Sequence, residues 1–199
     1  MTPGRHSRMV DFDAVLDFWF GPAGSADRGQ PKDAWFRRSA DFDAQIRGRF
    51  LAVHEAAAGG ALAAWEQAPG SALALALVLD QFSRNLFRGM PRSFAADALA
   101  LGVARRAVER GVDRLLSPVE RWFIYLPFEH SEDIADQARS VELFESLAGD
   151  AYSKSPIDYA RRHRAVIARF GRFPHRNAIL GRVSTPEELE FLQQPGSSF

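Results

Sequence analysis

The sequence predicts an all-α protein of stacked antiparallel helical hairpins, arranged either as a tetratricopeptide-like superhelix or as a compact helical array. Apolar residues recur at spacings of three and four along most of the chain, which is the period of one face of an α-helix. Three Ser-Pro or Thr-Pro pairs followed by acidic residues are typical helix starts. The one alternating segment, residues 72–79, consists mainly of Ala and Leu, which favour a helix over a strand.

The expected helices of the first half follow one another in order. Residues 39–58 form an amphipathic helix that Gly59 and Gly60 end. Residues 72–87 form a helix that is apolar on most sides, which places it at the centre of the fold. A further helix begins after Ser93 and ends at Gly111. The loosest connection is 21–33, where Gly, Ser, Pro and Gln accumulate.

The second half contains the clearest helix starts. Ser117 and Thr185 each combine an N-cap, a proline at the first helical position and a capping-box glutamate. Ser155 begins a similar sequence, and its helix is expected to end at Gly171. Between these elements, an apolar stripe over residues 134–148 predicts another helix, with Ser131 as its N-cap.

Composition limits the domain organisation and the partners. The 199 residues are enough for one domain, expected at 11–192, with a flexible segment at 1–10 and a tail at 193–199. The formal charge is zero, so nucleic acid is not an expected partner. No apolar run reaches membrane-spanning length, so a cytoplasmic protein is expected. The absence of cysteine excludes disulfides and thiolate chemistry.

Polar side chains interrupt the predicted central helix at four positions. Asp80, Gln81, Arg84 and Asn85 are spaced to share one patch, and buried charges need partners from elsewhere in the chain. One interpretation is structural, with an ion pair between Asp80 and Arg84 that stabilises helix packing. The other is a binding site, with Arg84 and Asn85 donating to a carboxylate or phosphate.

A second polar segment, residues 171–177, follows the helix that Gly171 ends. Arg172, His175, Arg176 and Asn177 lie near exposed backbone amides there, as expected of an anion site. His175 is also a candidate general acid or base. The structural alternative is that Arg176 pairs with Asp80 or Asp136 and that His175 caps a helix.

The third polar segment, residues 129–136, is rich in acidic groups. His130 and Asp136, with Glu132 or Asp133, have donor atoms suited to a metal ion, but their spacing is weakly specific, so we assign no metal ligands. The structural interpretation is a helix start whose dipole the acidic residues complement. His163 lies on an apolar stripe and is expected in the core. The four tryptophans are likewise expected in the core.

Four blocks of the sequence carry a resemblance to a known family. They are Val15-Leu-Asp-Phe-Trp-Phe-Gly21, Leu79-Asp-Gln-Phe-Ser-Arg-Asn-Leu-Phe-Arg-Gly89, Tyr125-Leu-Pro-Phe-Glu-His-Ser-Glu-Asp133 and Phe170-Gly-Arg-Phe-Pro-His-Arg-Asn-Ala-Ile-Leu-Gly-Arg182, with the ending Pro195-Gly-Ser-Ser-Phe199. They resemble the DUF924 family from about Val10 onward. The resemblance implies a helical fold grouped with the tetratricopeptide-like superhelices and a mainly bacterial, functionally uncharacterised family. It supplies no catalytic residues.

The function expected from these features is a binding or scaffold module whose central polar groove holds an anionic small molecule or a peptide carboxylate. The candidate ligand-binding residues are Asp80, Gln81, Arg84, Asn85, Arg172, His175, Arg176 and Asn177. The alternative is a hydrolase or lyase, with or without a metal, that uses His130 or His175 with Asp80 or Glu132. A third class is a purely structural partner. Cofactor and oligomeric state stay open, and the terminal Phe199 is a candidate internal ligand for the groove.

Overall fold

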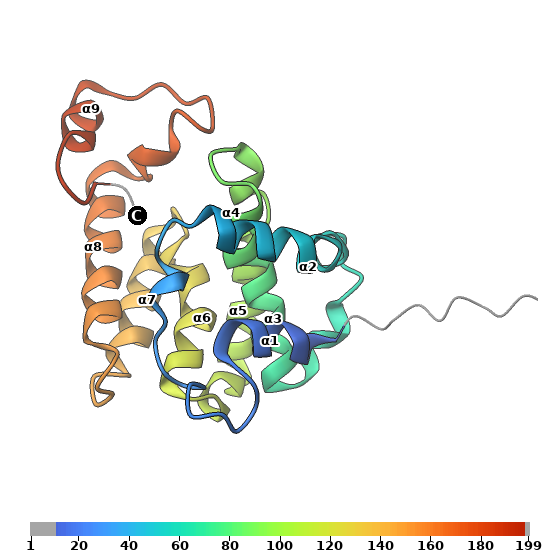
Figure 1. Ribbon diagram of the computed structural model, residues 1–199. Helices are drawn as coiled ribbons and strands as arrows, with labels where there is room; N and C mark the ends of the chain where they lie inside the picture. Colours follow the sequence, from blue (N-terminus) through green and yellow to red (C-terminus); the bar gives the residue numbers. More distant parts are fainter. Residues whose placement is uncertain (1–10, 198–199) are drawn as a thin grey trace, which may run out of the picture.

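The computed structural model describes residues 11–197, and within this range it contains helices and no strands (Figure 1). The all-α prediction is confirmed, in its compact-array form. The α-helices are α1 (Phe12–Phe20), α2 (Ala40–Ala58), α3 (Pro69–Leu77), α4 (Ser83–Leu86), α5 (Asp97–Glu109), α6 (Pro118–Glu129), α7 (Ile134–Glu145), α8 (Lys154–Phe170) and α9 (Pro186–Leu192). No helix in the described part of the chain is long and apolar enough to cross a membrane. The predicted segment 1–10 and the proposed ligand Phe199 lie outside the described residues.

Helix α3 lies at the centre, as its apolar composition predicts. Helices α1, α5 and α6 all pack against it, and its residues 71–77 are buried. Helices α5, α6, α7 and α8 then pack each against the next, and α8 lies at the edge of the array beneath α9 (Figure 1). The elements that carry polar side chains in the middle of the sequence are therefore brought together around α3 and the end of α6.

Aromatic side chains fill the core around α1 and α6. Trp19 stacks on Trp35 with ring centroids 5.9 Å apart, and the Phe123 ring lies edge-on to Trp35 at 4.9 Å. Trp122 is buried and donates to Ser153 Oγ at 2.8 Å. The core location expected for Trp19, Trp35 and Trp122 is confirmed, whereas Trp65 is only partly buried and packs against the core.

Several helix ends agree with the sequence pattern, and three do not. Complete capping boxes occur at Ser117 and Thr185. The N-cap of α7 is Asp133 rather than Ser131, because the Asp133 carboxylate accepts from the Ala135 N–H at 2.7 Å. Helix α8 begins at Lys154, so Ser155 lies inside its first turn, where the following proline costs no hydrogen bond. Helix α5 begins only at Asp97, because residues 91–94 form a separate 3-10 turn.

The predicted central helix contains a change of pitch. Helical conformation runs from residue 69 to 86, but Val78–Phe82 forms a π-helical turn, η3, between α3 and α4. Such single wide turns interrupt α-helices and are frequent at functional sites. The π-turn contains Asp80 and Gln81, the first two residues of the polar patch.

Candidate functional site

Asp80 is the buried anion at the centre of the candidate site. Its side chain is 1% exposed, and its carboxylate receives bonds from three directions. Oδ1 lies 3.0 Å from Arg84 Nη1 and 2.7 Å from His130 Nδ1, and Oδ2 accepts from Gln81 Nε2 at 2.7 Å. Burial alone would raise the pKa of Asp80, but Arg84 and His130 outweigh it and hold that pKa well below its usual range. Asp80 is therefore ionised at neutral pH.

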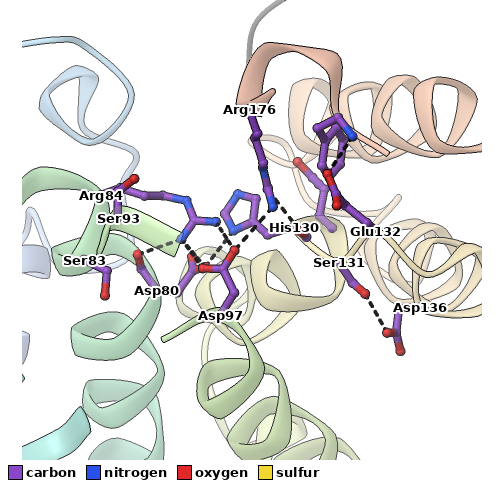
Figure 2. A network of polar contacts seen from close by, with 12 residues as sticks. Asp80, Ser83, Arg84, Ser93, Asp97, His130, Ser131, Glu132, Asp136 and Arg176 are labelled. Carbon is purple, nitrogen blue, oxygen red and sulfur yellow. Dashed lines mark hydrogen bonds and ion pairs between the residues drawn. The ribbon is translucent and has the colours of Figure 1, made fainter. Parts of the chain in front are cut away.

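Arg84 connects Asp80 to a second carboxylate. The predicted i,i+4 pair with Asp80 is confirmed, and the same guanidinium donates to both oxygens of Asp97, at 2.9 and 3.1 Å (Figure 2). Burial opposes the charge, but the two carboxylates raise the pKa of Arg84 above its ordinary value. This two-point contact orients Asp97, which begins helix α5, toward the π-turn.

Arg176 reaches the same carboxylate from the far end of the chain. Its Nη1 lies 3.4 Å from Asp97 Oδ2, and its Nη2 donates to the His130 carbonyl at 3.0 Å. The guanidinium lies between the rings of Phe94 and Phe173, with Cζ 4.7 and 4.5 Å from their centroids. Its Nε has no hydrogen-bond partner within residues 11–197. Burial and the nearby Arg84 lower the pKa of Arg176 to about 10.

His130 ends helix α6 and lies between Asp80 and Arg176. Because Asp80 is ionised, the 2.7 Å contact places a proton on His130 Nδ1. Burial, followed by the nearby Arg84, lowers the pKa of His130 below its ordinary value, although Asp80 opposes this. The imidazole is therefore neutral at neutral pH. We call Asp80, Arg84, Asp97, His130 and Arg176 the central cluster.

A second carboxyl–imidazole pair lies behind His130. His163 is buried, as predicted, with Nδ1 2.8 Å from the Tyr159 carbonyl and 3.1 Å from Glu129 Oε1. Its ring centroid lies 6.3 Å from that of His130. Burial lowers the pKa of His163 to about 3, and burial together with Asp80 raises the pKa of Glu129 well above its ordinary value. His163 is therefore neutral at neutral pH, and its surroundings favour the protonated form of Glu129.

A pocket of about 420 Å³ opens beside the central cluster. The residues that contribute polar groups to its lining are Asp97, His130, Ser131, Glu132 and Arg176. The rest of its wall is largely apolar and comes from η4 (Pro91–Phe94), α5, α6 and the segment before α9. The apolar lining residues are Pro91, Phe94, Ala95, Ala98, Leu101, Pro127 and Leu180. Its volume and its few convergent polar groups are typical of small-molecule sites.

The predicted ligand-binding residues divide into separate places. The structure brings Asp80, Gln81, Arg84 and Arg176 together. Asn85 instead faces α2 and donates to Asp43 at 2.7 Å, so it was wrongly grouped with them. His175 packs beside Phe173, with centroids 5.6 Å apart, and does not line the pocket formed by the described residues.

Arg172 and Asn177 belong to another group, which we call the C-terminal cluster. It consists of Glu132, Arg172, Asn177, Arg182 and Glu188. Arg172 donates to both oxygens of Glu188, at 2.6 and 2.8 Å, and Arg182 donates to both oxygens of Glu132, at 2.7 and 2.9 Å. Asn177 donates to Glu188 at 3.1 Å and accepts from Arg182. This cluster ties the 172–188 segment to the turn between α6 and α7. Its Glu132 lines the pocket, but Arg172 and Asn177 do not, so these two residues lie outside the groove predicted for them.

The weak metal-ligand set is not assembled. His130 is bound to Asp80, Glu132 to Arg182 and Asp136 to Arg105. Asp133 caps α7. No group of three or more His, Asp or Glu side chains within residues 11–197 is arranged to hold a metal ion. The suggestion that Arg176 pairs with Asp80 or Asp136 is also wrong, since its carboxylate partner is Asp97.

Three residues of the site were missed by the sequence analysis. Asp97 occupies the first turn of α5, where an acidic residue already has a structural explanation in the helix dipole. Glu129 lies within a highlighted segment but was given no role. Phe94 has no distinguishing pattern in the sequence, whereas its ring lies against Arg176. Only the tertiary contacts distinguish these residues from ordinary surface or core positions.

The fold and the pocket define a compact helical-array protein with one buried polar centre beside an apolar cavity. The chain belongs to the family described as "Bacterial protein of unknown function (DUF924)", whose model matches residues 15–196, so the family resemblance is confirmed. It is similar to a solved structure titled "Structure of Protein of Unknown Function ATU0120 from Agrobacterium tumefaciens", with 42% identity and a TM-score of 0.82. The match covers 92% of this chain and 97% of that chain. No curated protein matches the sequence.

Proposed function

We propose that the pocket beside the central cluster binds a small organic anion. The observation that carries this proposal is the incomplete pairing of Arg176, which is 6% exposed. A guanidinium has five N–H donors, and within the described residues only two contacts of Arg176 to oxygen atoms are formed. Asp97, its one carboxylate partner, is already held at both oxygens by Arg84. A ligand carboxylate would accept hydrogen bonds from the N–H groups of Arg176 that have no partner in the described part of the chain and would balance its charge.

The electrostatics support an anion over a cation. The lowered pKa of Arg176, about 10, means that its positive charge is destabilised by burial and by the nearby Arg84. Asp80 and Asp97 offer few further acceptor positions, since Arg84, His130 and Gln81 already occupy them. A bound anion therefore gains a charge-assisted hydrogen bond that the protein itself leaves unformed.

The pocket wall supports an apolar body attached to that anion. Phe94, Leu101 and Leu180 line the pocket together with the polar groups, and the volume of about 420 Å³ suits a compact molecule. An aryl or branched aliphatic carboxylic acid combines the two requirements. A peptide ending in an apolar residue offers the same chemistry at its terminal carboxylate. The cytoplasmic location expected from the sequence remains a prediction.

Calorimetric titration with phenylacetate tests this proposal, with phenylacetamide as the neutral control. We expect phenylacetate to bind and phenylacetamide to bind at least about tenfold more weakly, because the amide forms no charge-assisted contact. Arg176→Met should abolish the preference for the acid. Arg172→Met is the matched control, since Arg172 is engaged by Glu188, and it should leave binding within about twofold.

A further experiment distinguishes a peptide ligand from a free acid, and two results would reject the proposal. A short peptide with a C-terminal phenylalanine separates a peptide ligand from a free acid, since only a peptide ligand would bind more tightly with the added residues. Equal binding of phenylacetate to the wild type and to Arg176→Met would reject the proposal, as would equal binding of the acid and the amide.

A further inference from the structure

His130 lines the pocket beside Arg176 and retains a basic nitrogen. Its Nδ1 carries the proton shared with Asp80, so the lone pair of the neutral ring lies on Nε2. Within residues 11–197 no hydrogen bond to Nε2 is formed. The side chain is 14% exposed, which leaves it within reach of a small ligand.

The orientation of the imidazole is fixed from several sides. Asp80 holds Nδ1 and is itself held by Arg84 (Figure 2). Gln81 donates to the other oxygen of Asp80. The backbone carbonyl of His130 accepts from Arg176 at 3.0 Å. A carboxylate that orients a histidine and fixes its tautomer is the arrangement by which histidine acts as a general base in hydrolases. Its lowered pKa keeps the ring unprotonated at neutral pH.

No side-chain nucleophile accompanies His130 in the described residues. Ser131 lines the same pocket, but its hydroxyl donates to Asp136 at 2.7 Å. Ser93 lies nearby in η4 and donates to the Met90 carbonyl at 2.7 Å. The chain has no cysteine. A base without a partner nucleophile acts on water or on the substrate directly.

We propose that this pocket is an active site in which His130 is the general base for hydrolysis of a small carboxylic ester that bears a separate anionic group. The inference rests on the proposed function, because Arg176 must hold the anionic group for the ester to lie beside His130. Asp80 is the positioning residue that fixes the tautomer of His130.

The reaction needs only water as its second reactant. His130 Nε2 removes a proton from a water molecule as the water oxygen forms a bond to the ester carbonyl carbon. The tetrahedral intermediate then expels the alcohol oxygen as the C–O bond breaks, and the imidazolium returns the proton to it. The products are a carboxylic acid and an alcohol, and His130 ends the cycle neutral.

The substrate pair that tests this inference is 4-nitrophenyl glutarate, which carries a free carboxylate, and 4-nitrophenyl butyrate, which does not. Release of 4-nitrophenol is followed at several pH values. We expect faster turnover of the glutarate ester, and a loss of about 100-fold or more in His130→Gln. His175→Gln is the matched control for a histidine outside the pocket, and it should retain wild-type turnover within about threefold.

Asp80→Asn tests the positioning role through the pH–rate profile, whose inflection does not shift when a variant is merely less stable. Removing the carboxylate charge lowers the pKa of His130 further, because Asp80, more than Asp97, raises it. We therefore expect the inflection of the pH–rate profile to move to lower pH, together with a fall in the maximal rate. Thermal melting of each variant, with phenylacetate binding to His130→Gln, shows whether the variants stay folded.

The outcomes separate this inference from the proposed function. If phenylacetate binding depends on Arg176 but neither ester is turned over in a His130-dependent manner, the active-site inference is wrong and the binding function stands. Turnover that depends on His175 or that favours the butyrate ester would also overturn it. If Arg176-dependent binding is absent as well, both proposals fail.

Discussion

The central and C-terminal clusters draw arginines from the same short segment, residues 172–182, but they satisfy them differently. In the C-terminal cluster, Arg172 and Arg182 each face a carboxylate of their own, with two bonds shorter than 3 Å. In the central cluster, Arg176 shares Asp97 with Arg84 and reaches it only at 3.4 Å. The central cluster contributes Asp97, His130 and Arg176 to the pocket lining, and the C-terminal cluster contributes Glu132, which Arg182 already holds at both oxygens.

The difference shows how a binding site can be told from a structural network. Both clusters are charged, partly buried and rich in arginine, so composition does not separate them. The distinction lies in hydrogen-bonding capacity that the protein leaves unused beside a cavity. Arg176 and His130 both retain such capacity, whereas Arg172 and Arg182 use theirs to hold the chain.

The largest expected effect comes from removing the anion of the central cluster. Asp80→Ala leaves Arg84, His130 and Gln81 in the interior without their common acceptor. We expect the free energy of unfolding to fall by about 3–5 kcal/mol, measured by urea denaturation. Glu188→Ala in the C-terminal cluster should cost less, because water can reach the 29% exposed Arg172 left behind. An equal or larger loss at Glu188 would contradict the comparison.

The free energy of unfolding should depend on pH in different ranges for the buried histidines near the central cluster and for Glu188 in the C-terminal cluster. His163 and His175 have pKa values lowered to about 3 and about 4, chiefly by burial. Below about pH 6.5 the unfolded chain binds protons that the folded chain does not, so stability falls as the pH falls. We expect a loss of about 2 kcal/mol for each of these histidines between about pH 7 and pH 5, while the raised pKa of Glu129 acts in the opposite direction.

Glu188 should contribute to acid sensitivity only at lower pH. The bonds from Arg172 lower its pKa to about 2, so its stabilisation is complete above its ordinary pKa and is lost as the pH falls toward 2. His163→Gln should therefore flatten the stability profile between about pH 7 and pH 5, and Glu188→Gln should not. An unchanged slope in His163→Gln across this range would show that the histidine is not held neutral by burial.

The smallest expected effect is at the surface of α8. Arg169 pairs with Glu187 at 2.8 Å, but both side chains are about half exposed. Exposed pairs contribute little, so Arg169→Gln should change the free energy of unfolding by less than about 0.5 kcal/mol. Phenylacetate binding should not change. A larger loss of stability would mean that exposed ion pairs also stabilise the packing of α9 against α8. Burial would then not explain the difference in stability between the clusters.

The sequence predicted most of the helices and the Asp80–Arg84 pair, because both depend on local patterns. Capping boxes at Ser117 and Thr185 are local patterns, so they could be recognised without tertiary information. Asp80 and Arg84 were paired correctly because i,i+4 neighbours share a helix face. Asn85 was wrongly included, since five helical positions rotate it by about 140° from Asp80, toward α2.

The other contacts of the central cluster join distant parts of the chain. His130 lies 50 positions from Asp80, and Arg176 lies 79 positions from Asp97. No helical period relates residues so far apart, so the sequence pattern could identify them as candidates but could not predict which of them form pairs. The π-turn at residues 78–82 also has no recognised signature in the sequence, although it carries Asp80.

The most direct test of the central claim, that Arg176 retains binding capacity in the pocket, is a crystal structure of the protein saturated with phenylacetate. We expect the carboxylate within hydrogen-bonding distance of an Arg176 Nη atom, beside His130, with the phenyl ring against Phe94 and Leu101. A carboxylate bound instead at Arg172 or Arg182, with no density beside Arg176, would contradict it.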